Sequence, residues 1–274
     1  MLSFLSRINL IRYLIVWRVN SSLAFFPRYL SIDISKVIGS IISQRIPTTE
    51  KKAWKKALAP LIGSVDDASK NAPTKLAAIP DTAWPVNSVL FLYPGKRTYG
   101  RDELIFWELK LFGEHADHGL FLEVILPAME EASYTSDQQW SQRNRLWGHF
   151  DIHSVCAARG NQWEPVVTDG KLNLRYRANP LQWQEGLNLE PRSRHHFSRL
   201  NWMSPFDLSM ALTNLNKFDF AVDNQTLYKN HAPTLTLILT SLISRVNELV
   251  YEKSKRLDKV GSFLSDEERE IFQQ

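Results

Sequence analysis

The stretch LIRYLIVWRV, residues 10–19, decides the fold prediction because apolar residues recur at every second position. A period of two is typical of a β-strand, whose successive side chains point to opposite faces. Arg12 and Arg18 share the face opposite to the regular apolar set. The pattern predicts a strand with one core face and one partly basic face. The apolar set is Ile11, Tyr13, Ile15, Trp17 and Val19.

Helical and strand patterns alternate after this segment. Apolar residues at helical spacing behind the possible caps Ser31 and Asp33 predict a helix over 33–45. Pro127 is expected to kink or unwind a later helix locally. The order strand-helix-(helix)-strand-helix-strand predicts an α+β, ferredoxin-like (RRM-like) unit. The remaining segments are a helix over 49–62, a strand over 103–111, a helix over 120–132 and a strand over 147–156.

The second half of the chain repeats this order less completely. Strand-like segments over 171–177 and 194–202 precede a strongly patterned helix over 233–254. The predicted organisation is therefore one full unit over 1–158 and a second, incomplete or divergent unit over 159–274. Residues 63–88 hold three prolines without clear periodicity and are predicted to form a connection, and 134–145 are predicted to be a polar, mobile stretch.

The composition is that of a globular protein. The chain has 274 residues, of which 44% are apolar and 23% charged, and its formal net charge of +4 permits a polyanionic partner. A single cysteine, Cys156, excludes a disulfide framework and any multi-cysteine zinc site, and it suggests a reducing compartment. The most apolar run is half the roughly 20 residues that a spanning helix needs, and no signal peptide is evident. The expected location is the cytoplasm, with no membrane partner.

Several motifs that mark common enzymes and cofactor sites are missing from the sequence. It has no nucleotide-binding glycine loop, no serine nucleophile elbow and no paired-cysteine motif, so no cofactor is predicted. His149, Asp151 and His153 share one face of a predicted strand, which resembles a set of metal ligands. The two histidines would stand roughly 13 Å apart, too far to hold one ion unaided, so no metal site is predicted.

The densest basic window lies at residues 191–200. Arginine forks suit phosphates, and histidine both stacks on bases and exchanges protons near neutrality. An RNA-facing strand is one interpretation of this window, and an exposed basic turn is the other. The window contains Arg192, Arg194, His195, His196 and Arg199.

The other basic candidates are dispersed along the first half of the chain. Arg12 and Arg18 lie on the first strand, Arg28 lies in the turn before the first helix, and Arg45 lies at the end of that helix. In a ferredoxin-like unit the first strand and the end of the following helix can border one groove. These arginines are predicted to contact RNA, although each alone is more often an ordinary surface residue.

Five segments together resemble the RAMP superfamily of CRISPR-associated proteins, and most closely its CRISPR-RNA-processing endoribonucleases. The resemblance covers most of residues 10–254 and rests on the order of strands, turns and helices. The segments are RYLIVWRVNSSLAFFPRYLSIDISKVIGSII, YPGKRTYGRDELIFWELKLFGEHADHGLFLEVILPAMEEA, GHFDIHSVCAARG, LNWMSPFDL and TLTLILTSLISRVNELV.

The resemblance implies a metal-independent endoribonuclease. In that reaction the ribose 2′-hydroxyl attacks the adjacent phosphate of a CRISPR repeat RNA beside a hairpin, leaving a 2′,3′-cyclic phosphate and a 5′-hydroxyl. His196 or His195 is then the candidate general base, and Arg28 is the candidate phosphate clamp. Other Cas proteins of an effector complex are the expected partners.

Two departures from the family pattern keep other functions open. Family members commonly carry a catalytic histidine near the first helix, whereas the first 114 residues here contain none, and the sequence stops soon after the helix over 233–254. One alternative is a RAMP-type subunit that binds CRISPR RNA without cutting it. Another is a protein-interaction scaffold whose basic surface is incidental.

Overall fold

The computed structural model describes residues 6–26, 30–67, 84–93, 95–135, 146–186 and 235–250. Residue contacts divide the chain into two compact units, one formed by Asn9–Leu187 and the other by Met1–Ile8 with Asn188–Gln274. The boundary predicted between 1–158 and 159–274 falls one residue before the end of a strand in the first of these units.

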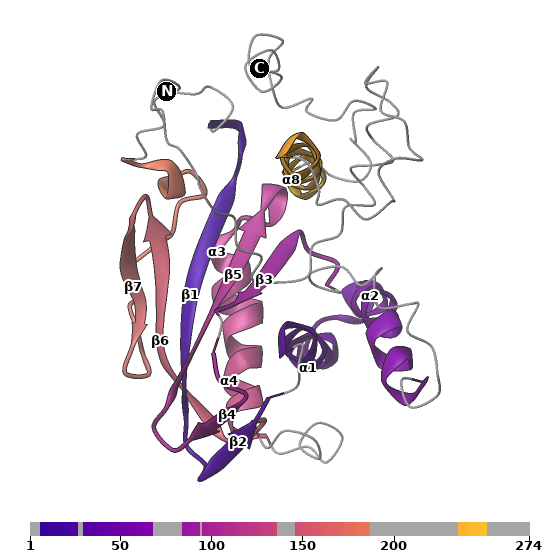
Figure 1. Cartoon of the computed structure of the whole chain (residues 1–274), viewed down its shortest axis with the longest axis vertical. Helices are drawn as coiled ribbons and strands as arrows, with labels where there is room; N and C mark the ends of the chain where they lie inside the picture. The colour runs from indigo at the N-terminus through magenta and orange to yellow at the C-terminus, as the bar shows by residue number, and fades with distance from the viewer. Residues whose placement is uncertain are drawn as a thin grey trace. The chain divides into compact units, whose positions relative to one another are not determined.

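Six of the described strands of the Asn9–Leu187 unit form one sheet in which every neighbouring pair is antiparallel (Figure 1). β1 (Leu10–Val19) lies between β5 (Leu104–Phe112) and β6 (Phe150–Arg159). The sheet order is β3-β5-β1-β6-β7-β8. The other three strands are β3 (Ser88–Leu92), β7 (Gln162–Thr168) and β8 (Lys171–Leu172).

The period of two in β1 separates the two faces of the sheet as the sequence predicts. Tyr13, Ile15 and Trp17 are fully buried on the core face, where Ile15 pairs with Trp107 of β5 and Val155 of β6. Stacked and edge-to-face aromatic contacts fill this layer, including Trp17 against Trp107 at 5.0 Å between ring centroids.

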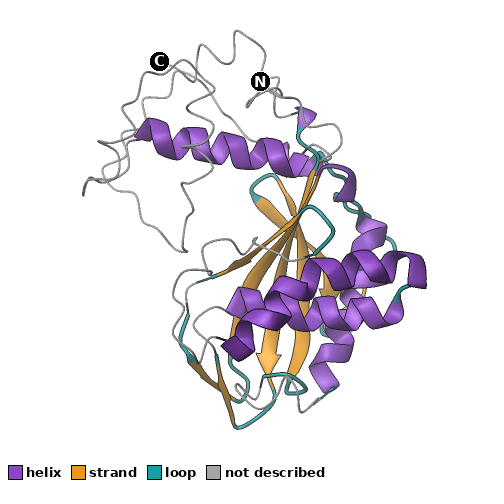
Figure 2. Cartoon of the chain, turned by 90° about the vertical axis from the view of Figure 1, so that its right-hand side faces the viewer, coloured by secondary structure: helices purple, strands orange, loops and turns teal. Residues whose placement is uncertain are grey.

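The helices of the Asn9–Leu187 unit gather on the core side of the sheet (Figure 2). α1 (Leu30–Arg45) packs against α2 (Thr48–Asp67) and α4 (Leu126–Tyr134), and its apolar stripe is buried as predicted. A Cβ at Gly39 of α1 would lie 2.7 Å from Nε1 of Trp84 and 2.8 Å from Cδ2 of Leu58. A side chain at this position would therefore require Trp84 and Leu58 to shift.

The helix predicted over 120–132 is interrupted next to its proline, as expected. A short helix α3 (His118–Leu120) leads into a π-helical turn (Phe121–Ile125), and α4 follows with Pro127 in its first turn. The Asp117 side chain caps the start by accepting hydrogen bonds from the backbone N–H groups of Gly119 and Leu120.

The prediction of a strand over 171–177 is wrong beyond its first two residues. β8 ends at Leu172, because Asn173 begins a turn in which its side chain accepts a hydrogen bond from the backbone N–H of Arg175. The predicted connection over 63–88 also differs from the structure, since α2 extends to Asp67 and β3 begins at Ser88.

Two short strands, β2 (Leu23–Phe25) and β4 (Thr98–Gly100), form a separate antiparallel pair that the sequence does not predict. The predicted helix over 233–254 is confirmed as α8 (Leu235–Val250) in the other unit. The predicted strand over 194–202 lies outside the described residues. Among the described helices, none combines the length and the apolar character that crossing a membrane requires.

Candidate nucleic-acid interface

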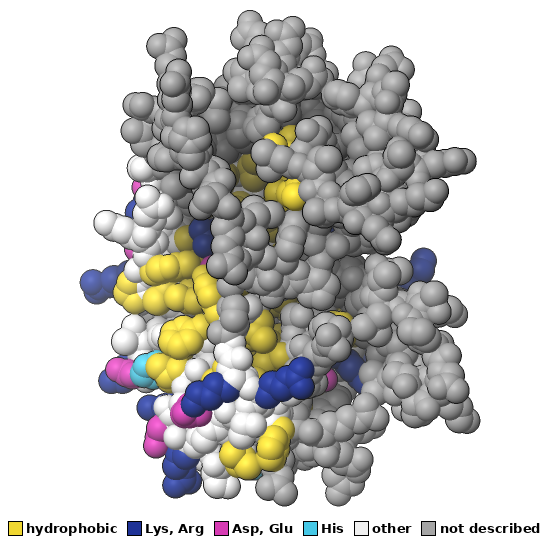
Figure 3. All heavy atoms as spheres, viewed as in Figure 1, with side chains coloured by type: hydrophobic (Ala, Val, Ile, Leu, Met, Phe, Trp, Pro, Cys, Tyr) yellow, Lys and Arg dark blue, Asp and Glu magenta, His cyan; other side chains and the backbone are white. Residues whose placement is uncertain are grey.

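The face of the sheet opposite the helices carries the basic side chains that the first strand predicts. Arg12 and Arg18 both lie on this open face, about 20 Å apart by the rise of a strand. Figure 3 shows an apolar patch over the sheet with Lys and Arg side chains beside it. Phe106 of β5 (43% exposed) and Trp163 of β7 (36% exposed) contribute large aromatic surfaces.

A polar cluster occupies the middle of the open face. The Arg12 guanidinium donates to both carboxylate oxygens of Glu108, from Nε at 3.2 Å to Oε2 and from Nη2 at 3.1 Å to each oxygen. The Tyr93 hydroxyl donates to Oε1 of the same carboxylate. Lys110 Nζ lies 3.7 Å from its Oε2. Strand pairing creates the cluster, because β1 and β3 flank β5.

Burial and charge balance explain why this cluster is stable. Glu108 is only 2% exposed, and an isolated carboxylate in such a place is costly unless cations and hydrogen bonds compensate it. Burial, together with the hydrogen bond to Glu108, raises the pKa of Tyr93 to about 12. The phenol therefore stays protonated and acts as a donor at neutral pH.

Each of the two cations of the cluster lies over an aromatic ring. The Arg12 guanidinium carbon lies 5.2 Å from the ring centroid of Trp163, and Lys110 Nζ lies 5.2 Å from that of Phe91. Phe91 in turn meets Tyr93 edge-on, with ring centroids 5.1 Å apart. Cations and aromatic surfaces thus interleave across the open face.

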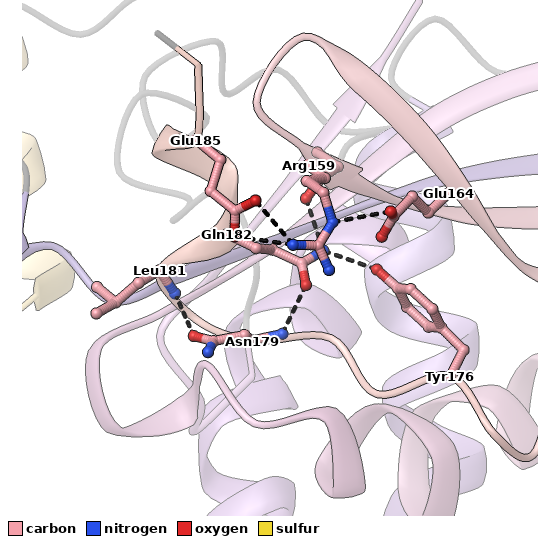
Figure 4. A network of polar contacts seen from close by, with 8 residues as sticks. Arg159, Glu164, Tyr176, Asn179, Leu181, Gln182 and Glu185 are labelled. Atoms are coloured by element: carbon pink, nitrogen blue, oxygen red, sulfur yellow. Dashed lines mark hydrogen bonds and ion pairs between the residues drawn. The ribbon is translucent and has the colours of Figure 1, made fainter.

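A second polar network fixes the β6–β7 hairpin that carries Trp163 (Figure 4). Arg159 donates from Nε to Glu164 and from Nη1 to Glu185, each at 2.8 Å. Gln182 Nε2 donates to the Tyr176 hydroxyl at 2.7 Å and to a backbone carbonyl of β6 at 2.8 Å. These contacts tie the segment after β8 to the hairpin.

The remaining predicted basic residues have different positions. Arg18 lies toward the end of β1 and donates from Nη2 to Asp151 at 3.2 Å, while Asn20 bonds the other oxygen of that carboxylate at 2.9 Å. Arg45 is in the helical layer, where Nη1 donates to the Pro127 carbonyl at 2.9 Å and to Glu131 at 3.2 Å. The sheet therefore separates Arg45 from the two arginines with which a common groove is predicted.

The other predicted site residues are Arg28, Arg192, Arg194, His195, His196 and Arg199, and they lie outside the described residues. Asp151 of the triad weighed as metal ligands is engaged by Arg18 and Asn20. In the part of the chain that the structure describes, no three His, Cys, Asp or Glu side chains are placed to hold a metal ion.

Sequence reasoning missed most of the central cluster. In the strand predicted over 103–111, Ile105, Trp107, Leu109 and Leu111 recur at every second position on the predicted core face. The outward positions of Phe106, Glu108 and Lys110 could therefore be read from the same period of two. Phe106, a large aromatic residue at an outward position, was the signal in the sequence that could have indicated this site. Tyr93 and Trp163 lie in segments for which no strand is predicted.

No family model, no curated protein and no solved structure matches the chain.

Proposed function

We propose that the protein binds single-stranded RNA across the open face of its six-stranded sheet. The observation that carries the proposal is the interleaving of Arg12 and Lys110 with aromatic rings on that face. Single-stranded RNA exposes unstacked bases that stack on aromatic and guanidinium planes, while cations attract its phosphates. Phe106 and Trp163 offer the exposed ring surface that such stacking needs.

The chain topology supports this proposal. With β2, α2, β4 and the short helices before α4 set aside, the order β1-α1-β3-β5-α4-β6 and the strand arrangement β3-β5-β1-β6 agree with those expected of a ferredoxin-like unit. RNA-recognition modules with a four-stranded sheet bind bases on aromatic side chains of the sheet. We infer that Asn9–Leu187 contains such a unit, extended at one edge by β7 and β8.

The proposed RNA is a CRISPR repeat transcript, as the resemblance to RAMP-superfamily proteins implies. In this proposal the open face holds a single-stranded part of the repeat, and the protein joins other Cas proteins in an effector complex. His195, His196 and Arg28 are the proposed groups for cleavage of the bound strand. A RAMP-type subunit that holds the RNA without cutting it uses the same open face.

Fluorescence anisotropy with a labelled CRISPR repeat RNA tests the binding proposal. We expect affinity to fall with rising salt, because phosphate contacts release counterions, and we expect a duplex of the same sequence to bind more weakly. Phe106→Ala should weaken binding about 5- to 150-fold, the usual loss of one stacked base. The matched control is Phe25→Ala, because Phe25 is 45% exposed but lies in the separate β2–β4 pair.

Equal affinity of the Phe106→Ala and Phe25→Ala variants for RNA would refute the assignment of the open face. The same RNA incubated with protein in EDTA then separates the two RNA functions on a denaturing gel. A single cut that disappears when one 2′-hydroxyl is replaced by hydrogen supports the nuclease, and an intact but bound RNA supports the binding subunit. Binding of no RNA supports the scaffold.

A further inference from the structure

The Arg12 guanidinium is held in one orientation, but Glu108 uses only some of its N–H donors. Glu108 occupies its Nε and Nη2 edge, and the Trp163 ring lies beside it at 5.2 Å. No described residue accepts a hydrogen bond from Nη1. The outer edge of the guanidinium, with N–H groups on Nη1 and Nη2, therefore presents two parallel donors in a fixed fork.

Guanine is the base that matches such a fork. Its O6 and N7 atoms are adjacent acceptors, and a bidentate arginine contact to them is the commonest specific contact to a base edge. Adenine carries a donor amino group in place of O6, so it meets the same fork donor to donor. In a single strand this edge of the base is free for recognition.

The surroundings of Arg12 favour a base over a phosphate. The Glu108 carboxylate touches the guanidinium and is 2% exposed, so an anionic phosphate bound there would be repelled by a poorly solvated like charge. A neutral base edge meets no such repulsion. Aromatic rings flank the cluster on both sides, with Trp163 on β7 and Phe91 and Tyr93 toward β3. These rings offer the stacking that positions a base.

We infer that Arg12 recognises a guanine base of the bound single strand, and that Glu108 and Trp163 are the positioning residues that aim its guanidinium. This inference rests on the proposed binding of RNA to the open face. Arg18, about 20 Å along the same strand and paired with the more exposed Asp151, is assigned to a phosphate.

The test measures the binding of four labelled 12-nucleotide RNAs. Each is oligouridine with one central substitution, which is guanosine, inosine, 7-deazaguanosine or adenosine. We expect the unaltered protein to prefer guanosine over adenosine on the order of 10- to 100-fold, the discrimination typical of a bidentate contact. Inosine keeps O6 and N7 and should bind like guanosine, whereas 7-deazaguanosine lacks N7 and should lose most of the preference.

Variants test whether Arg12 and Glu108 cause the preference for guanosine over adenosine. Arg12→Lys and Glu108→Gln should each reduce the guanosine-to-adenosine affinity ratio toward one, and this ratio is a readout that general loss of structure does not change selectively. Arg18→Lys is the matched control, since it should weaken all four RNAs by a similar factor and leave the ratio unchanged. Where a variant fails to fold, the modified bases still test the contact with the unaltered protein.

Each outcome decides the inference. RNA binding with equal affinity for guanosine and adenosine overturns the guanine contact and leaves the proposed function standing. The guanine contact is likewise overturned if Arg12→Lys weakens all four RNAs equally, because Arg12 then contacts a phosphate. If no RNA binds the unaltered protein, both the inference and the proposed function are wrong.

Discussion

Arg12→Met provides a strong test of the energetics of the open face. The substitution keeps an unbranched apolar stem but removes the cation that bonds both oxygens of Glu108. The carboxylate is then left with the Tyr93 hydroxyl and with Lys110, whose Nζ is 3.7 Å away. A buried carboxylate without its main partner is the expected source of instability.

The size of the effect follows from burial. Removing one partner of a fully buried ion pair typically costs about 3–5 kcal/mol. The Arg12 side chain is 30% exposed, so water replaces part of the lost contact, and we expect a loss of about 2–3 kcal/mol in the free energy of unfolding. For a unit of this size that corresponds to a drop of about 5–10 °C in Tm.

Thermal and urea unfolding followed by circular dichroism measure this loss. The double variant Arg12→Met/Glu108→Leu removes the buried charge with its partner and should recover stability to within about 1 kcal/mol of the unaltered protein. A single variant as stable as the unaltered protein would show that the ion pair is dispensable. A double variant as unstable as the single one would show that the loss does not come from an uncompensated carboxylate.

Three further predictions concern other parts of the unit. Gly39→Ala should lower stability by about 1–3 kcal/mol in urea unfolding, because its Cβ meets Trp84 and Leu58, whereas Gly100→Ala has no neighbour nearer than 3.9 Å and should change little. Burial lowers the pKa of His118, whose Nδ1 lies 2.8 Å from the Tyr13 hydroxyl, so the folded state favours neutral histidine. The free energy of unfolding should therefore fall as pH drops below about 6.5, because the unfolded chain takes up the proton there. His118→Gln should make the free energy of unfolding depend less on pH in this range. Cys156 lies on the open face opposite Leu14, so bound RNA should slow its alkylation by N-ethylmaleimide, measured by intact mass, and an unchanged rate would place RNA elsewhere.

Local periodicity predicts the parts of the fold that are patterned on their own. β1, α1 and β5 each carry an uninterrupted apolar set at the spacing of their element, and these predictions are confirmed within a few residues. β7 escapes prediction because Pro165 lies within it and its pairing with β6 shifts register, which breaks the period of two. β3 is short and follows a proline-containing segment without periodicity.

The central cluster of the site could not be predicted from local sequence patterns, for a different reason. Arg12 and Glu108 are 96 residues apart, and only the pairing of β1 with β5 makes them neighbours. The sequence identifies Arg12 as an outward basic residue of a strand, which is confirmed. It does not show that a carboxylate holds the guanidinium, and that contact is what turns a surface arginine into an oriented donor.

Crosslinking of RNA to the unaltered protein tests the central claim most directly. A repeat RNA carrying 4-thiouridine is irradiated in the complex, and the crosslinked tryptic peptides are identified by mass spectrometry. We predict crosslinks in the peptides 102–110 and 160–171, which contain Phe106 and Trp163 of the open face. Crosslinks confined to peptides of α1 and α2, on the other side of the sheet, would contradict the account.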